Sequence, residues 1–167
     1  MLNRHNKADG LALLLFVFII YAPGINAAEG DVVLRPYAGY SRVSSSISSL
    51  DGNSSNIGFR LMFGAGEKKS AGLEVTRFDL GGGNDFYAAG IVIEQRIRQT
   101  ISISIGTLGY FDMGVNSDNP VGLSASINWE PWVGKNFLPY LSLRNDVVFY
   151  SETVSIYSIS AGFKLDL

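Results

Sequence analysis

The feature of this sequence that most constrains its fold is a two-residue alternation of apolar and polar side chains. The last stretch, Thr153–Leu167, shows this alternation along most of its length. From Tyr157 onward every second residue is apolar, and from Ser158 onward the residues between are small or charged. Because side chains of a strand point to opposite faces in turn, this stretch predicts a strand with one apolar and one polar face. At the edge of a soluble sheet such a strand would promote aggregation, whereas a strand that closes a barrel has no free edge.

The same alternation recurs upstream and predicts seven further strands. Each predicted strand is roughly ten residues long, which matches a tilted strand that crosses a bilayer. We therefore predict an all-β fold, an eight-stranded antiparallel up-and-down transmembrane β-barrel, present as a monomer. The predicted strands are Asp31–Val43, Asn56–Gly64, Ser70–Asp79, Phe86–Gln95, Thr100–Phe111, Val121–Glu130, Phe137–Tyr150 and Thr153–Leu167.

The first strand and the connections carry further expectations. Pro36 donates no ladder hydrogen bond, so we expect a bulge or a strand start there. The polar, turn-prone stretch Ser44–Ser55 predicts a mobile loop. Asp112–Pro120 is the other long polar connection. With both termini in the periplasm these two loops face outside, which is the loop asymmetry typical of bacterial membrane barrels.

The N-terminal region has the order of a secretory leader. Arg4 and Lys7 precede an apolar run, Leu11–Tyr21, which is followed by small residues up to Ala28. The run is too short for a helix that spans hydrocarbon, which needs roughly 20 residues, so a membrane anchor is the weaker alternative. We predict a cleaved signal peptide at residues 1–27 and the barrel at residues 28–167.

The composition of the polar face indicates that this face lines the lumen. A soluble lipocalin-like barrel, the alternative, would show water a polar face rich in Lys, Glu, Gln and Thr. Here the face is mainly Gly and Ser, with a few charges that need partners in a confined lumen. We expect Arg60 to pair with Glu74, and Glu74 and Glu94 to form salt bridges with Arg60 and Arg144. The predicted structural lumen network consists of Arg35, Arg60, Glu74, Glu94, Arg144 and Asp146.

The opposite face is dominated by Ile, Leu and Val. Arg77 falls on it, but near the outer end of its strand, where a charge costs little. Aromatic residues gather toward both ends of the predicted strands, as at membrane interfaces. The expected periplasmic belt is Phe63, Trp129, Trp132, Phe137 and Phe163, and the outer belt is Tyr40, Phe59, Tyr87, Phe111, Phe149 and Tyr157.

Three stretches resemble the small outer-membrane barrels of Gram-negative bacteria, the OmpA transmembrane domain and OmpX-like group. They are RPYAGYS at Arg35–Ser41, GLEVTRFD at Gly72–Asp79 and the apolar C-terminal strand. The resemblance implies residence in the bacterial cell outer membrane, contact with its lipids and lipopolysaccharide, and insertion by the barrel-assembly machinery. It also implies a C-terminal insertion signal, at Tyr157, Phe163, Leu165 and Leu167. Such barrels usually end in Phe, whereas this sequence ends in Leu167.

The chain offers little for chemistry. Its one histidine, His5, lies in the predicted leader, and it has no cysteine, so no Ser–His or Cys–His arrangement is expected. Glu74 and Glu94 as an acid/base pair are the less favoured alternative to lumen salt bridges. Asp112, Asn116 and Asp118 match no known cation loop. We expect no catalytic, cofactor-binding or metal-binding residues.

These observations predict a non-enzymatic outer-membrane protein. A formal net charge of −2 gives no electrostatic footprint for nucleic acid. Side chains fill the interior of an eight-stranded barrel, which argues against a porin-sized channel. We expect a structural or surface-interaction role, with exposed loops and a lumen filled by polar and charged side chains. The alternatives are a lipid-modifying enzyme with non-histidine chemistry and a narrow channel or carrier for a small molecule.

Overall fold

The computed structural model describes residues 32–64, 68–81, 84–113, 119–131, 137–149 and 152–167. The predicted signal peptide at residues 1–27 lies outside the described residues and stays a prediction. No helix in the described part of the chain has both the length and the hydropathy to cross a membrane.

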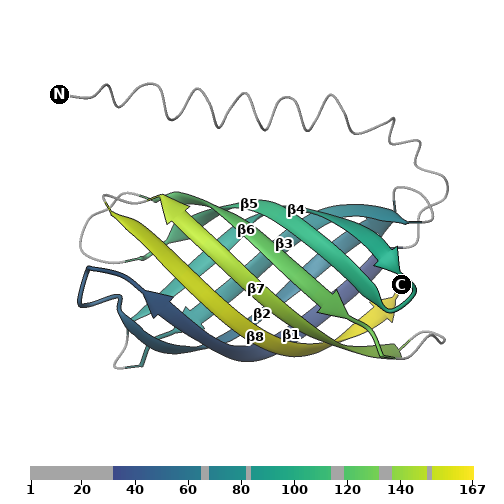
Figure 1. Cartoon of the computed structure of the whole chain (residues 1–167), viewed down its shortest axis with the longest axis horizontal. Coiled ribbons are helices and arrows are strands. Elements are labelled where there is room, and N and C mark those ends of the chain that lie inside the picture. Colours follow the sequence, from purple (N-terminus) through teal and green to yellow (C-terminus); the bar gives the residue numbers. More distant parts are fainter. Residues whose placement is uncertain (1–31, 65–67, 82–83, 114–118, 132–136, 150–151) are drawn as a thin grey trace, which may run out of the picture.

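Eight antiparallel strands form a closed barrel in which each strand pairs with its neighbours in the sequence (Figure 1). The last strand pairs with the first, for example Ala161 with Ala38, and closes the barrel. The predicted fold class is confirmed. The strands are β1 (Val32–Ser44), β2 (Gly52–Gly64), β3 (Lys69–Asp79), β4 (Asp85–Arg98), β5 (Ile101–Phe111), β6 (Val121–Trp129), β7 (Phe137–Phe149) and β8 (Thr153–Asp166).

The two ends of the barrel differ in their connections. We call the end with the β1–β2, β3–β4, β5–β6 and β7–β8 connections the loop end. We call the opposite end the turn end; there β1 begins and β8 ends, and Figure 1 places the C-terminus. The predicted even strand count thus brings both ends of the barrel sequence to one side.

The prediction of a mobile loop over Ser44–Ser55 is wrong at both of its ends, because Ser44 belongs to β1 and residues 52–55 belong to β2. β2 begins at Gly52, because residues from Gly52 to Ser55 pair one for one with the end of β1. These ladder bonds outweigh the low strand propensity of Gly, Asn and Ser. The remaining connection is a tight turn in which the backbone N–H of Leu50 donates to Ile47 O at 2.9 Å. Arg42 and Asp51 form an ion pair across its base at 2.8 Å.

Most other strand limits agree with the prediction to within one residue. The exception is β4, which continues to Arg98 rather than ending at Gln95. Its extra residues pair irregularly with β5, where the register shifts between Arg96 and Arg98. Of the predicted seventh strand, Tyr150 lies outside the described residues.

Pro36 lies in the middle of β1, so the expectation of a bulge or a strand start is wrong. It pairs with Phe59 of β2, and the register with β8 is the same before and after it, at Leu34↔Leu165 and Tyr37↔Gly162. Only the β8 side of the ladder is interrupted at Arg35 and Pro36. A missing N–H is tolerated here because the register on both sides holds the strand in place.

The inner and outer faces separate as the alternation predicted. Large apolar side chains on the outer face are exposed, among them Ile57, Leu73, Ile91 and Leu143, at 52 to 60%. Exposed aromatic side chains lie near both ends of the outer face. Of the predicted belts, Phe63, Trp129 and Phe163 are exposed on one side and Tyr40, Tyr87, Phe111, Phe149 and Tyr157 on the other. Phe59 is also exposed, but its assignment to the outer belt is wrong, because it lies in the middle of β2, next to Arg60. Trp132 and the side chain of Phe137 lie outside the described part.

Glycine is required on the inner face where strands curve tightly past one another. A Cβ added at Gly72 would lie 2.0 Å from Leu61 O, and one added at Gly90 would lie 2.0 Å from Thr107 O. Neither position admits any other residue without a shift of the backbone. The inner face therefore needs small residues for two reasons: backbone atoms of neighbouring strands lie very close to it, and the lumen has little volume.

Candidate functional site

The middle of the lumen is built around the carboxylate of Glu74 on β3. Glu74 is 1% exposed, and Arg60 lies directly opposite it on β2. The predicted pair is present, since Arg60 Nε lies 2.6 Å from Glu74 Oε2. Arg144 of β7 contacts the other oxygen, Oε1, from across the lumen. One carboxylate thus connects three strands of the barrel.

Further polar groups complete the coordination of these charges. The Tyr37 hydroxyl donates to Glu74 Oε1 at 2.8 Å, and Thr76 Oγ1 lies 2.5 Å from that hydroxyl. Arg144 also binds both carboxylate oxygens of Asp146 at 2.6 Å, in a bidentate arrangement. Two arginines and two carboxylates balance in charge, as burial in a medium of low polarity demands. We call Arg60, Glu74, Arg144 and Asp146 the central network.

A second charged group lies closer to the turn end. Arg35 Nη1 lies 2.8 Å from Glu94 Oε2, and Arg35 Nη2 lies 3.7 Å from Glu130 Oε1. Arg96 approaches the other oxygen of Glu130 at 3.8 Å. Asn128 Nδ2 donates to Glu94 Oε2 at 3.0 Å. This group is also balanced, with two arginines and two carboxylates.

All six residues of the predicted lumen network are buried, but their pairing differs in part from the expectation. Glu94 pairs with Arg35, not with Arg60 or Arg144, because Arg35 lies at its level near the turn end. Sequence reasoning missed Glu130 and Arg96 as members. Glu130 shared the parity of the polar face, which was a usable signal. The fourth strand is predicted to end at Gln95, so the prediction does not place Arg96 in the lumen, whereas β4 continues to Arg98.

Small hydroxyl and amide groups fill the space between the charged residues. Arg60 Nη1 donates to Ser104 Oγ at 3.1 Å, and Ser104 and Ser126 hydroxyls lie 2.5 Å apart. On the side toward the loop end, Asn56 Nδ2 donates to Ser41 Oγ at 2.6 Å and Ser160 Oγ donates to Asn56 Oδ1 at 3.0 Å. The serines act as donors and acceptors that satisfy buried groups.

The lumen at the loop end is apolar, which corrects the expectation of a lumen filled throughout by polar and charged groups. Phe78 and Phe86 stack there with ring centroids 4.7 Å apart. Ile47 and Leu50 of the β1–β2 connection pack into it, so this predicted polar loop has an apolar inner side. We call the buried set the apolar plug: Val43, Leu50, Phe78, Phe86, Ala88, Leu108, Tyr110, Met113, Val148, Val154 and Ile156.

Arg144 connects the central network to the apolar plug. The guanidinium carbon of Arg144 lies 5.8 Å from the centroid of the Phe78 ring, within the range of a cation–π interaction. Arg144 therefore belongs to the central network through its nitrogens and touches the apolar plug through its flat face.

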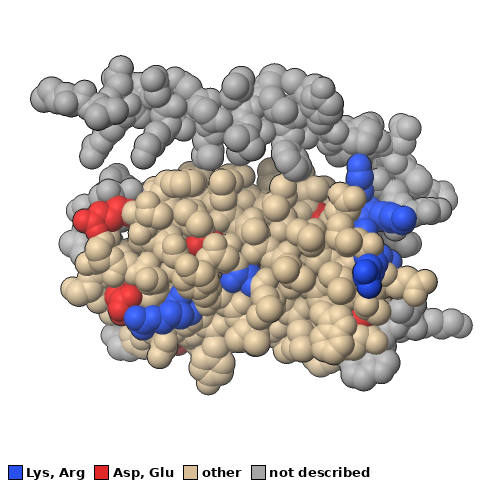
Figure 2. All heavy atoms as spheres, in the orientation of Figure 1, with Lys and Arg blue, Asp and Glu red and all other residues tan. Residues whose placement is uncertain are grey.

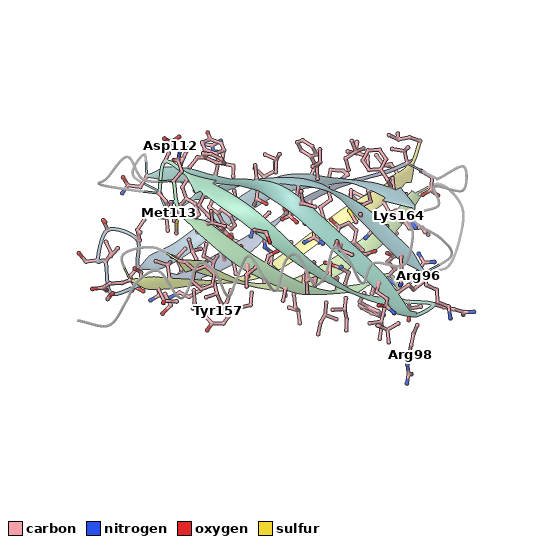
Figure 3. All side chains as sticks on the ribbon, turned by 90° about the horizontal axis from the view of Figure 1, so that it is seen from above. Arg96, Arg98, Asp112, Met113, Tyr157 and Lys164 are labelled. Atoms are coloured by element: carbon pink, nitrogen blue, oxygen red, sulfur yellow. The ribbon has the colours of Figure 1, made fainter. Side chains whose placement is uncertain are left out.

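The lumen offers no arrangement for ordinary catalysis among the described residues. Glu74 and Glu94, considered as an acid/base pair, are each held by arginine. No group of three or more His, Cys, Asp or Glu in the described ranges could hold a metal ion. Asp112 lies at the loop end (Figure 3), whereas Asn116 and Asp118 of the cation candidate lie outside those ranges.

The predicted insertion signal lies on the outer face and the end of β8. Tyr157 and Phe163 are exposed on that face, and Leu167 is 75% exposed. Leu165 pairs with Leu34 and Phe137. The backbone N–H of Leu167 donates to Val32 O at 2.8 Å, so the pairing with β1 continues to the last residue of the sequence. Recognition by an assembly machinery stays a prediction.

The two rims of the barrel carry opposite charge. On the face shown in Figure 2, blue Lys and Arg atoms gather at the end where Figure 1 places the C-terminus. Among the described residues the turn end carries Lys68, Lys69, Arg96, Arg98 and Lys164 against Glu130 and Asp166. The loop end carries Asp51, Asp79, Asp85, Asp112 and Glu152 against Arg42 and Arg77.

Comparison with solved structures identifies the class of fold. Neisserial surface protein A (NspA) is 13% identical with a TM-score of 0.62, and the match covers 81% of this chain and 97% of that one. The N-terminal β-barrel domain of Pseudomonas aeruginosa OprF is 11% identical with a TM-score of 0.53, covering 81% and 99%. No protein-family model matches the sequence, and no curated protein matches it. The chain thus has the fold of the small eight-stranded outer-membrane barrels, as its resemblance to that group implied.

Proposed function

We propose that this protein is an integral protein of the bacterial outer membrane, and that it serves as a sealed, non-enzymatic barrel with a structural or surface-interaction role. The observation that carries the proposal is an inverted placement of side chains, the reverse of the placement found in a soluble protein. The barrel's large apolar side chains are exposed on the outer face, while the charged side chains that point into the lumen are buried. Such an inversion is stable in a bilayer and unfavourable in water. The fold is that of the small eight-stranded outer-membrane barrels, which supports the location.

The filled lumen supports a sealed barrel over a channel or carrier. Each charge of the central network is neutralised by a partner, so a passing ion would have to break buried ion pairs. The apolar plug then blocks the loop end with residues that are almost fully buried. An apolar constriction excludes water even where the backbone leaves space.

The charge of the loop end supports a role in surface contact. With the turn end in the periplasm, the five acidic residues of the loop end face outward. A basic surface on a partner complements this end directly. Phosphates of lipopolysaccharide would need divalent cations to bridge them to these carboxylates, and we expect lipopolysaccharide contact to take that form.

Location and orientation are tested with single cysteines, because the chain has none of its own. Ser48→Cys lies in the β1–β2 connection and Gln99→Cys in the β4–β5 turn, and both positions are exposed. A membrane-impermeant maleimide applied to intact cells should label Ser48→Cys and spare Gln99→Cys until the outer membrane is opened. The reverse pattern would invert the orientation, and recovery of the protein in the soluble periplasmic fraction would contradict the proposal.

Sealing is tested in planar bilayers with the purified barrel. We expect no conductance steps from protein whose gel mobility shifts on heating, which shows that it is folded. Conductance from every inserted barrel would favour the channel alternative. Lipid A and phospholipid acylation should be the same in strains with and without the protein, and a consistent difference would favour the enzyme alternative.

A further inference from the structure

The outer face carries cations at both ends of the barrel, but only those at the loop end are paired. There Arg42 pairs with Asp51 at 2.8 Å, and Arg77 contacts Asp85. At the turn end Lys69 and Arg98 also face outward, and neither forms an ion pair with a described residue. An unpaired cation at the edge of an apolar band is free to take an anionic lipid headgroup as its counter-charge.

A break in the strand register places Arg98 on the outer face. Arg96 pairs with Ser102, and Arg98 pairs with Ile101, so the regular alternation is shifted by one residue between them. Without this bulge Arg98 would share the inward parity of Glu94 and Arg96. With it, the Arg98 side chain points away from the barrel (Figure 3), and Ile97 beside it is 54% exposed. Bulges redirect side chains in this way.

Lys69 and Arg98 lie on the same sector of the turn end. Lys69 pairs with Gln95 across the β3–β4 ladder, and the backbone N–H of Arg96 donates to Lys68 O at 2.7 Å. The start of β3 therefore lies beside the end of β4 that carries Arg98. Exposed aromatic residues flank this sector, with Phe63 at the end of β2 and Trp129, opposite Ile101, at the end of β6.

We propose that Lys69 and Arg98, between Phe63 and Trp129, bind the headgroup of an anionic phospholipid in the leaflet at the turn end. This inference rests on the proposed function, since it requires the barrel to span a bilayer. Arginine offers a planar set of donors to phosphate oxygens, and lysine adds a compact charge beside it. Aromatic side chains at this depth pack against the glycerol and upper acyl region. The added negative charge distinguishes this lipid from a zwitterionic one, whose own cation competes for the phosphate.

The test measures lipid selectivity through Trp129. Trp132→Phe leaves Trp129 as the single tryptophan of a chain that has two. This barrel is reconstituted in vesicles that contain brominated phosphatidylglycerol or brominated phosphatidylcholine at equal mole fraction. We expect the brominated anionic lipid to quench Trp129 more than its mole fraction predicts. Lys69→Gln and Arg98→Gln should each lower the relative association constant about fivefold.

The matched control is the double variant Arg42→Gln and Arg77→Gln, which removes the outward cations of the loop end. Its selectivity should equal that of the parent. The parent's preference should also weaken in about 1 M NaCl, where the Debye length is about 3 Å. An equal response to both lipids, a preference that survives loss of Lys69 and Arg98, or one that salt does not weaken would overturn the proposal.

Failure of the inference and failure of the proposed function give different results. A barrel that shows a heat-dependent gel shift in vesicles but no lipid preference contradicts the headgroup site alone. A barrel that never inserts contradicts the membrane location itself. If the glutamine variants do not fold, the parent's preference and its salt dependence still decide the proposal. Lys69→Arg and Arg98→Lys, which keep the charge, should retain most of the selectivity.

Discussion

The lumen is filled in two different ways: by paired charged side chains in the central network, and by apolar side chains in the apolar plug at the loop end. In the central network every charge is buried in the middle of the strands and is matched by a partner from another strand or a neighbouring position. At the loop end the apolar plug has no charge to match, and Ile47 and Leu50 of the β1–β2 connection help to cover it.

Position along the barrel therefore determines whether the lumen is filled by paired charges or by apolar side chains. A connection that folds back can cover the loop end and bury apolar groups there. Among the described residues, side chains of the strands fill the middle of the lumen. Paired charges and serines there link strands that are far apart in the sequence, as Glu74 links Arg60 and Arg144. This arrangement specifies the barrel's internal register as well as filling its volume.

Glu74→Gln should have the largest effect on stability, because it removes the carboxylate at the centre of the central network. It leaves Arg60 and part of Arg144 without a carboxylate, and an uncompensated buried charge costs about 3–5 kcal/mol. The free energy of unfolding, measured by urea titration in vesicles, should fall by that amount. Glu152→Gln, at an exposed carboxylate of the loop end, is the control and should change stability by less than about 0.5 kcal/mol. Equal effects of the two would mean that the central network contributes nothing.

Leu108→Ala tests the apolar plug. Leu108 is fully buried, so its truncation should lower the free energy of unfolding by about 3 kcal/mol through lost transfer energy and a cavity. The loss should not depend on salt. Leu143→Ala on the lipid-facing side, where Leu143 is 59% exposed, is the matched control. A change of under about 1 kcal/mol for Leu108→Ala would show that the plug is loosely packed.

Ser126→Ala tests how much the hydroxyl hydrogen bonds of the central lumen contribute to stability, compared with its ion pairs. The Ser126 hydroxyl lies 2.5 Å from Ser104 Oγ, 3.4 Å from Arg60 and 3.5 Å from Asn128 Oδ1, and the variant removes these contacts without removing a charge. The expected loss is about 1 kcal/mol, the usual net value of a hydrogen bond. A loss as large as that of Glu74→Gln would mean that hydroxyls, rather than ion pairs, hold the network together.

Asp51→Asn should have the smallest effect. The Arg42–Asp51 pair is exposed at 51% and 38% of its side chains, so its contribution should be under about 1 kcal/mol. The small difference from the parent should vanish in about 1 M NaCl because solvent ions screen exposed charges. A persistent loss at high salt would contradict the assignment of the effect to the exposed ion pair with Arg42.

The architecture could be predicted from the sequence because it depends on a repeated local pattern. Alternation gave the number of strands and the inward or outward direction of most side chains. Arg60 and Glu74 could be paired because they lie on sequence-adjacent strands joined by a short turn.

The remaining features depend on contacts that no local pattern contains. The Glu74–Arg144 contact spans the barrel between β3 and β7, and the Arg35–Glu94 pair depends on the stagger of strands around it. The apolar plug was missed because Phe78, Val154 and Ile156 share the parity of the polar face, so strand alternation alone assigned them to a polar lumen. The β4 bulge could not be predicted because the alternation ends the fourth strand at Gln95, before the register shift between Arg96 and Arg98.

The pairing of β1 with β8 has a consequence for how the barrel folds. Tyr37 and Gly162 are neighbours across that seam, although nearly the whole barrel sequence lies between them. Contacts of such long sequence separation form slowly, because most of the chain must be ordered before they can be made. Hairpins between consecutive strands can form early, but the first strand keeps an open edge until the last one arrives. Folding of this chain should therefore be limited by seam closure, and slowing that step should lengthen the time during which an aggregation-prone edge is exposed.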